Sequence, residues 1–253
     1  MATSPKCCEL PPVSHEYTPK GKYETIGGVH TYVVGPENST KGIIDVFDIF
    51  GIRAQTIQGA DRLSVHSGAV VLVPDLFNGT GLEDSLVPTD TDEKKAKVHA
   101  FFGTTANLQD NLAKVLEVRK AAGERFPAAE GHWGLFGLCW GGKVAVLASG
   151  EDNKGEGRRF NVSGQAHPGL LDENDARALT CPHIMLAAPD EPVDLVAKYK
   201  EVLAEPGKEG VVETYETMFH GWMGARANLQ DEKNVKEFQR GYKRVGEYFA
   251  KHL

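Results

Sequence analysis

Cys139 is the residue of this sequence whose surroundings most clearly indicate chemistry. It follows the apolar run 133–138, and glycines stand two residues before it and two residues after it, at Gly137 and Gly141. In a turn from a strand directly into a helix, glycine at both flanks lets the backbone pack where a Cβ atom would collide. The pattern predicts a nucleophile elbow with cysteine at the nucleophile position. The alternative is a buried, inert cysteine, because free cysteine is among the most buried residue types.

Two residues at the ends of later predicted strands complete a catalytic set, Asp190 and His220. Nucleophile, acid and histidine follow one another in the chain order of α/β-hydrolases. A histidine can take the proton of the thiol, and a carboxylate behind it can orient the imidazole. We expect Asp190 rather than Glu191 to be that carboxylate, because it directly follows the apolar strand. His167, which also ends a predicted strand, is the alternative base.

The predicted elbow also places main-chain donors near the sulfur. Because the nucleophile begins a helix, its thiolate lies near the positive helix end, which favours the ionised form. The N–H of Trp140, directly after Cys139, is one expected donor to the oxyanion of the reaction, and the N–H of Ile49, in the loop after an earlier strand, is the second.

The elements that must position these residues alternate between strands and helices. Apolar, β-prone runs at 29–34, 42–47, 69–75, 133–138, 158–168, 181–190 and 210–215 predict strands, and 53–67, 107–122 and 231–251 predict helices. This alternation predicts an α/β fold, with a mostly parallel sheet covered by helices on both faces. The irregular and charged segment 77–103 is a candidate lid.

Length and composition limit the classes of protein to consider. The chain has 253 residues, a net charge of -7 and 41% hydrophobic residues. We expect a single domain over 1–253 with a polar leader at about 1–20, no nucleic-acid or membrane partner, and a cytoplasmic location. Four cysteines do not make a disulfide framework for a chain of this size. Cys7 and Cys8 would need ligands from elsewhere to hold a metal, so we expect neither metal nor cofactor.

Several motifs together resemble the dienelactone hydrolase family, a cysteine branch of the α/β-hydrolases, from about Lys41 to the C-terminus. They are the sequences at 48–51 (DIFG), 74–77 (PDLF), 137–142 (GLCWGG), 190–193 and 220–222 (HGW). The leader also resembles that of the fungal members.

The resemblance implies the triad Cys139, Asp190 and His220, and it implies that Asp48 contacts the cysteine in the resting enzyme. Bacterial members usually carry Glu at that acidic position. Two arginines with which bacterial members bind a substrate carboxylate fall on Gly79 and Gly224 here, and Arg226 is a candidate substitute for the second.

The expected function is hydrolysis of an activated ester, enol lactone or thioester through an acyl-enzyme, by a carboxylic ester hydrolase that is a monomer or homodimer. Aromatic residues suggest an apolar substrate pocket. The expected pocket residues are Phe50, Phe77, Trp222 and Arg226. Two alternatives stay open: a non-catalytic ligand binder or thiol sensor on the same fold, and a lyase or isomerase acting on a lactone.

Overall fold

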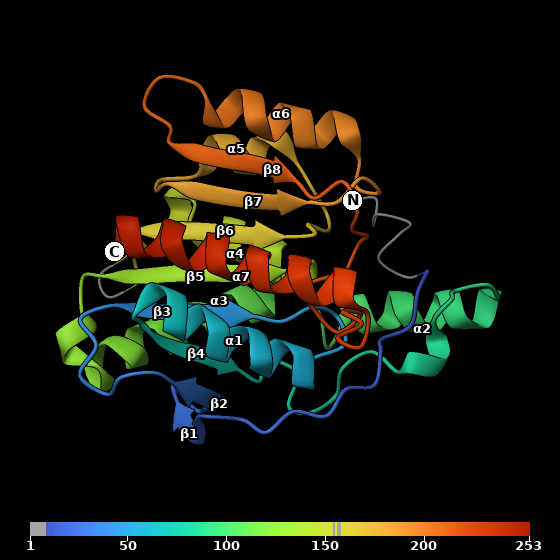
Figure 1. Cartoon of the computed structure of the whole chain (residues 1–253), viewed down its shortest axis with the longest axis horizontal. Helices are drawn as coiled ribbons and strands as arrows, with labels where there is room; N and C mark the ends of the chain where they lie inside the picture. The colour runs from blue at the N-terminus through green and yellow to red at the C-terminus, as the bar shows by residue number, and fades with distance from the viewer. Residues whose placement is uncertain (1–8, 154, 156–157) are drawn as a thin grey trace.

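A single eight-stranded sheet runs through the computed structural model, which describes residues 9–153, 155 and 158–253 (Figure 1). Cys7 and Cys8 lie outside the described residues. The strand order across the sheet is β1-β2-β4-β3-β5-β6-β7-β8. The strands are β1 (Lys22–Ile26), β2 (Val29–Val34), β3 (Gly42–Val46), β4 (Val70–Pro74), β5 (Trp133–Leu138), β6 (Val162–Ala166), β7 (His183–Ala187) and β8 (Gly210–Thr214).

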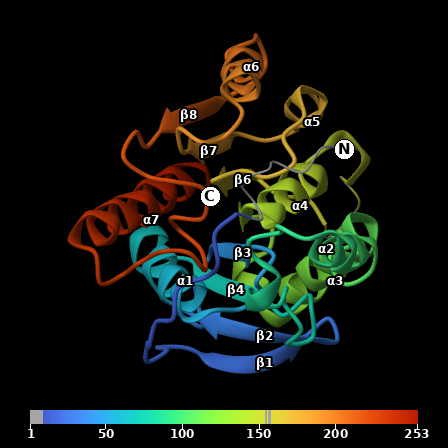
Figure 2. The same ribbon diagram turned by 90° about the vertical axis from the view of Figure 1, so that its right-hand side faces the viewer.

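Helices cover both faces of this sheet (Figure 2). On one face α1 packs against α7, and on the other α3 packs against α4, with α4 in contact with α5 and α5 with α6. The α-helices are α1 (Ala54–Ser67), α2 (Asp92–Gly103), α3 (Leu108–Arg125), α4 (Trp140–Ala148), α5 (Glu173–Ala178), α6 (Val193–Leu203) and α7 (Glu232–His252). The short 3₁₀ turns are η2 (Asp84–Leu86), η3 (Pro127–Ala129) and η4 (Glu151–Asn153).

The central strands are parallel and buried on both faces, as their continuous apolar runs predict. Every residue of β3, β4, β5, β6 and β7 is buried. At one edge β2 pairs antiparallel with both β4 and β1. The turn between β1 and β2 is Gly27–Gly28, and both glycines have positive φ, which the tight turn of a hairpin requires. Strand β1, inside the stretch that follows the expected leader, is an addition to the predicted elements.

The turn from β5 into α4 depends on glycines that touch backbone. A Cβ atom at Gly137 would lie 2.1 Å from the carbonyl oxygen of Gly141, and one at Gly141 would lie 2.3 Å from that of Val46. The start of α4 therefore sits directly on the ends of β5 and of its neighbour β3, closer than any other residue type allows.

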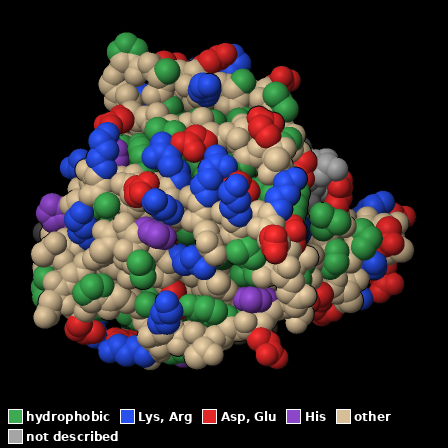
Figure 3. All heavy atoms as spheres, viewed as in Figure 1, with side chains coloured by type: hydrophobic (Ala, Val, Ile, Leu, Met, Phe, Trp, Pro, Cys, Tyr) green, Lys and Arg blue, Asp and Glu red, His purple; other side chains and the backbone are tan. Residues whose placement is uncertain are grey.

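Charged side chains of both signs share the face that α7 covers (Figure 3). Lys and Arg gather over the middle of this face with Asp and Glu among them. Several form ion pairs, including Arg240 with Glu237 and Arg244 with Glu213. In the described ranges, no helix combines the length and the apolar character needed to cross a membrane.

One acidic side chain is buried inside the sheet. Asp45 lies in β3 with no exposed surface, and neither carboxylate oxygen has a hydrogen-bond partner among the described residues. Burial disfavours the charged carboxylate and raises the pKa of Asp45 to about 8. The folded protein therefore holds this group as a neutral acid at neutral pH.

The raised pKa of Asp45 predicts a pH-dependent loss of stability. Between about pH 4 and pH 8 the unfolded chain ionises this group and the folded chain does not, so its contribution to the free energy of unfolding falls by about 1.4 kcal/mol per pH unit. We expect Asp45→Asn to remove this slope, as measured by urea denaturation from pH 4 to pH 8. Asp92→Asn, at an exposed position of α2, is the control and should keep it. Parallel curves for wild type and Asp45→Asn would contradict the prediction.

Candidate active site

The cysteine at the elbow lies between the sheet and the start of α4, at the carboxyl end of the strands. Cys139 has φ 51° and ψ -111°, a strained conformation for a residue with a side chain. Its N–H donates to the carbonyl of Ala166 at 3.1 Å, and its carbonyl accepts from Gly142 at 3.0 Å and from Gly169 at 3.2 Å. These bonds hold the strained turn between β5 and α4.

His220 contacts the sulfur directly. Its Nε2 lies 3.1 Å from Cys139 Sγ, and its Nδ1 lies 3.0 Å from Oε1 of Glu191. With Glu191 ionised, its oxygens only accept hydrogen bonds, and Nδ1 then carries the hydrogen. Nε2 is then left to accept the proton of the thiol. All three residues are buried, with Cys139 and His220 each 2% exposed.

The carboxylate behind the histidine is Glu191, one position after the expected Asp190. The turn after β7 brings the N–H of Glu191 to the carbonyl of Ala188, and a Glu191 oxygen in turn accepts the N–H of Ala188. This closed turn points the longer side chain at the imidazole. Asp190 instead accepts the main-chain N–H of His220 at 2.9 Å. Both acids thus hold His220, one through its ring and the other through its backbone.

Burial raises the pKa of Glu191, and the hydrogen bond and charge of His220, with the Ala188 N–H, oppose the shift. The pair is therefore coupled: a positive charge on the imidazole favours the ionised carboxylate. Such coupling suits a base that gains and loses a proton during a reaction.

Asp48 holds two loops of the site together. Its Oδ1 accepts the N–H of Phe50 at 3.0 Å, and its Oδ2 accepts the N–H of Ala225 at 2.8 Å. Burial raises the pKa of Asp48, which these two N–H groups, Arg226 and His220 oppose. Asp48 thus bridges the loop after β3 and the loop after His220, and its expected contact with the cysteine stays a prediction.

The two expected oxyanion donors lie on neighbouring elements. Ile49 is in the loop after β3, and Trp140 is the first residue of α4, directly after β5. Strands β3 and β5 are paired, with Val46 opposite Gly137, so their following loops are adjacent. N–H groups in the first turn of a helix have no intrahelical acceptor, which leaves that of Trp140 available to a ligand.

The expected pocket residues separate into two groups. Phe77 packs 4.8 Å from the Trp140 ring, beside the elbow, and 5.4 Å from Phe101 of α2. The expected lid segment 77–103 therefore reaches the elbow through its aromatic side chains. Trp222, in contrast, stacks on Tyr215 at 4.5 Å, and its ring faces α7. Trp222 is thus a core residue rather than a lining residue.

Arg226 contacts both Phe50 and the leader. The Arg226 guanidinium lies 5.1 Å from the centre of the Phe50 ring, and its Nε donates to the carbonyl of Leu10. The leader is also held by a hydrogen bond of 2.9 Å from the Val13 N–H to the carbonyl of Ala225. Sequence reasoning missed this docking, because no local pattern marks it.

His167, the alternative base, lies beside His220 rather than in its place. The two rings meet edge to face with centroids 5.3 Å apart, and His167 is fully buried with φ 37°. Burial, His220 and Arg226 together hold its pKa well below the usual value for histidine. His167 is thus a neutral imidazole next to His220.

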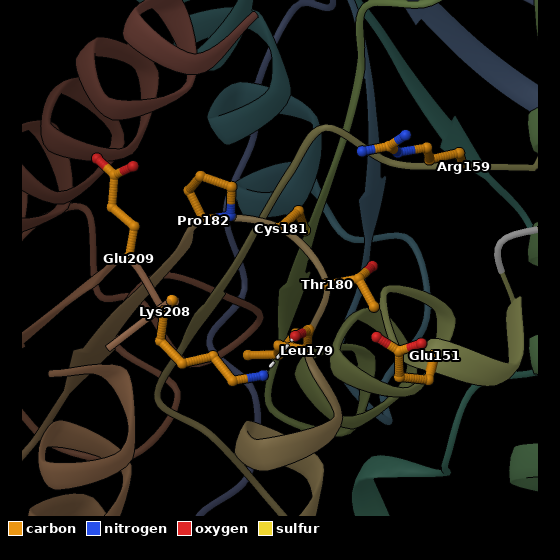
Figure 4. Close-up of a pocket in the computed structure, with 9 residues that line it drawn as sticks. Glu151, Arg159, Leu179, Thr180, Cys181, Pro182, Lys208 and Glu209 are labelled. Carbon is orange, nitrogen blue, oxygen red and sulfur yellow. Dashed lines mark hydrogen bonds between the residues drawn. The ribbon is translucent and has the colours of Figure 1, made fainter. Parts of the chain in front are cut away.

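A cavity of about 470 Å³ lies at the amino ends of the strands, opposite to the end that carries Cys139 (Figure 4). It contains Cys181, before β7, and Lys208, before β8. Lys208 Nζ is engaged by the carbonyls of Arg177 and Leu179, at 2.6 and 2.7 Å. Within the described ranges no cluster of three His, Cys, Asp or Glu side chains is arranged to hold a metal ion.

Known proteins resemble this chain in sequence. The model of the dienelactone hydrolase family matches residues 29–253. An uncharacterized AIM2 family protein of Schizosaccharomyces pombe is 35% identical over 240 residues, which cover 92% of each chain. The hydrolase TropI of Talaromyces stipitatus is 25% identical over 263 residues, covering 100% of this chain and 99% of its own.

Solved structures share the fold at low sequence identity. Dienelactone hydrolase from Anabaena variabilis superposes with a TM-score of 0.60 at 13% identity, covering 94% of this chain and 100% of its own. A dienelactone hydrolase-like promiscuous phosphotriesterase from metagenomic libraries gives 0.62 at 15% identity, covering 93% and 98%. The predicted α/β-hydrolase fold is confirmed. Because the family model spans the chain from β2 to its end, this protein belongs to the dienelactone hydrolase family.

Proposed function

We propose that this protein is a carboxylic ester hydrolase that acts through an acyl-enzyme on Cys139. The observation that carries the proposal is the hydrogen-bonded chain of Glu191, His220 and Cys139, with contacts of 3.0 and 3.1 Å. A nucleophile, a base within reach of it and an acid that orients the base are the parts that acyl transfer requires. Membership of a hydrolase family supports the same reaction class.

The acylation step follows from this chain. His220 Nε2 takes the thiol proton, and the thiolate attacks the carbonyl carbon of the ester. A C–S bond forms while the π electrons of the carbonyl move to its oxygen, which the N–H groups of Ile49 and Trp140 would stabilise. Collapse of this intermediate breaks the C–O bond, and the leaving oxygen takes the proton from His220. Glu191 stabilises the imidazolium that exists between the two transfers.

The substrate class follows from leaving-group chemistry and from the charges near the site. A thiolate leaves a tetrahedral intermediate more readily than an alkoxide does, so activated esters, enol lactones and thioesters are favoured. A Cβ atom at Gly224 would lie 2.3 Å from Asp48 Oδ2, so no arginine fits there. Arg226 is engaged by Phe50 and Leu10. We therefore propose an acyl group without a carboxylate.

The geometry favours a hydrolase over a thiol sensor. A sensor needs no acid to orient the histidine, yet the ring of His220 is held by the buried Glu191. Turnover requires that orientation, and it is present.

The acyl-enzyme is the first prediction of this proposal. Incubation with p-nitrophenyl butyrate followed by acid quench and mass spectrometry should show a butyryl group on Cys139. His220→Ala should lower kcat/KM by about 10³-fold or more, because the base is lost. Cys181→Ser, far from the site, is the control and should keep the activity. Labelling confined to Cys181 would contradict the proposal.

The two neighbouring acids give the second prediction. Glu191→Gln should lower kcat by about 10² to 10⁴-fold, because an amide neither stabilises the imidazolium nor fixes the hydrogen on Nδ1. Asp190→Asn should cost less than about tenfold, since the new amide oxygen still accepts the His220 N–H. Steady-state kinetics on the same ester, with thermal unfolding to confirm folding, provides the measurement. The reverse order of effects would show that Asp190 is the orienting acid.

A further inference from the structure

His167 is a buried polar side chain that the acylation step does not use. It is fully buried, and within the described part of the chain neither ring nitrogen has a hydrogen-bond partner. Leaving two such groups unpaired costs free energy, so a buried imidazole in this state needs an explanation. A hydrogen-bonding role toward a molecule that enters the site during the reaction is one.

The backbone of His167 is tied to the nucleophile. His167 follows Ala166, whose carbonyl accepts the N–H of Cys139, and it precedes Gly169, whose N–H donates to the carbonyl of Cys139. A Cβ atom at Gly169 would lie only 3.2 Å from Cys139 Sγ, so this loop packs directly on the sulfur. With φ 37°, His167 occupies a conformation that few residue types adopt. Strain of this kind is concentrated at active sites.

The ring of His167 lies beside the ring that must activate water. The His167 and His220 centroids are 5.3 Å apart, with the planes at 76°. In the acyl-enzyme Sγ carries the acyl group, and Nε2 of His220 becomes the acceptor for a water proton. A water molecule there needs at least one further polar partner to be held in one orientation. A neutral imidazole provides both a donor and an acceptor.

We propose that His167 hydrogen-bonds to the water that hydrolyses the acyl-enzyme and holds it against His220. This inference rests on the proposed function. The water oxygen forms a bond to the acyl carbon, one O–H bond breaks, and its proton passes to Nε2 of His220 while the carbonyl π electrons move to oxygen. Collapse then breaks the C–S bond, and the thiolate recovers the proton from His220. His167 gains and loses nothing in the step.

The experiment separates acylation from deacylation. With p-nitrophenyl butyrate the leaving p-nitrophenolate needs no proton at neutral pH. The burst of colour therefore reports acylation without the proton transfer from His220 to the leaving oxygen. Deacylation is measured as the loss of the butyryl group from Cys139, which is monitored over time by acid quench and mass spectrometry. This first-order decay is independent of how much of a variant is folded. The variants are His167→Phe, which removes both polar atoms, and His167→Asn, which keeps a donor and an acceptor and tolerates positive φ.

We expect His167→Phe to keep the burst rate within about twofold and to slow butyryl loss about tenfold, the worth of one hydrogen bond. His167→Asn should recover most of the decay rate. Burst and decay falling together would overturn the inference, because His167 would then act on the placement of His220. An unchanged decay would overturn it as well. Absence of butyryl-Cys139 in the wild type would overturn the proposed function and this inference with it.

Discussion

The bonds at both nitrogens of the His220 ring are the constraint on which the rest of the site depends. In the proposed mechanism the imidazole serves as a base only if one nitrogen is kept for the incoming proton, and the contact of Nδ1 with Glu191 would achieve this. The second requirement is a fixed position of the ring, which the hydrogen bond from the main-chain N–H of His220 to Asp190 supplies. The parallel strands β5 and β7 place the sulfur and the two acids at the carboxyl end of the sheet. The fold therefore sets the geometry of the hydrogen-bonded series Glu191, His220 and Cys139.

Much of this arrangement could be predicted from the sequence because close packing dictates residue types. A Cβ atom added at Gly137 or Gly141 would lie 2.1 or 2.3 Å from a backbone carbonyl oxygen, so only glycine fits at these two positions. The choice between Asp190 and Glu191 depends instead on how a turn closes. Two adjacent acids have the same chemistry, and their order along the chain does not say which one faces the ring. Only the bond between Glu191 and the Ala188 N–H decides it.

Features that depend on contacts between distant parts of the chain were less accessible. The Gly27–Gly28 pair is a local signal for a hairpin and could have revealed β1. No such signal marks the docking of the leader on Ala225, which is about 200 residues away along the chain. The placement of Trp222 against α7 rather than at the site is of the same kind, because an aromatic residue near a catalytic motif suits either position.

The hydrogen bonds of Asp48 fix the relative positions of two loops of the site. One oxygen holds the loop after β3, which contains Ile49, and the other holds the loop that follows His220. The loop that contains Ile49, the proposed oxyanion donor, and the loop that follows His220, the proposed base, are thus cross-linked through one buried side chain. In the proposed reaction such a link would fix the dipoles before any substrate arrives, so that little reorganisation energy would be spent when charge separates. It also makes the two loops a single mechanical unit, in which a displacement of one is passed to the other.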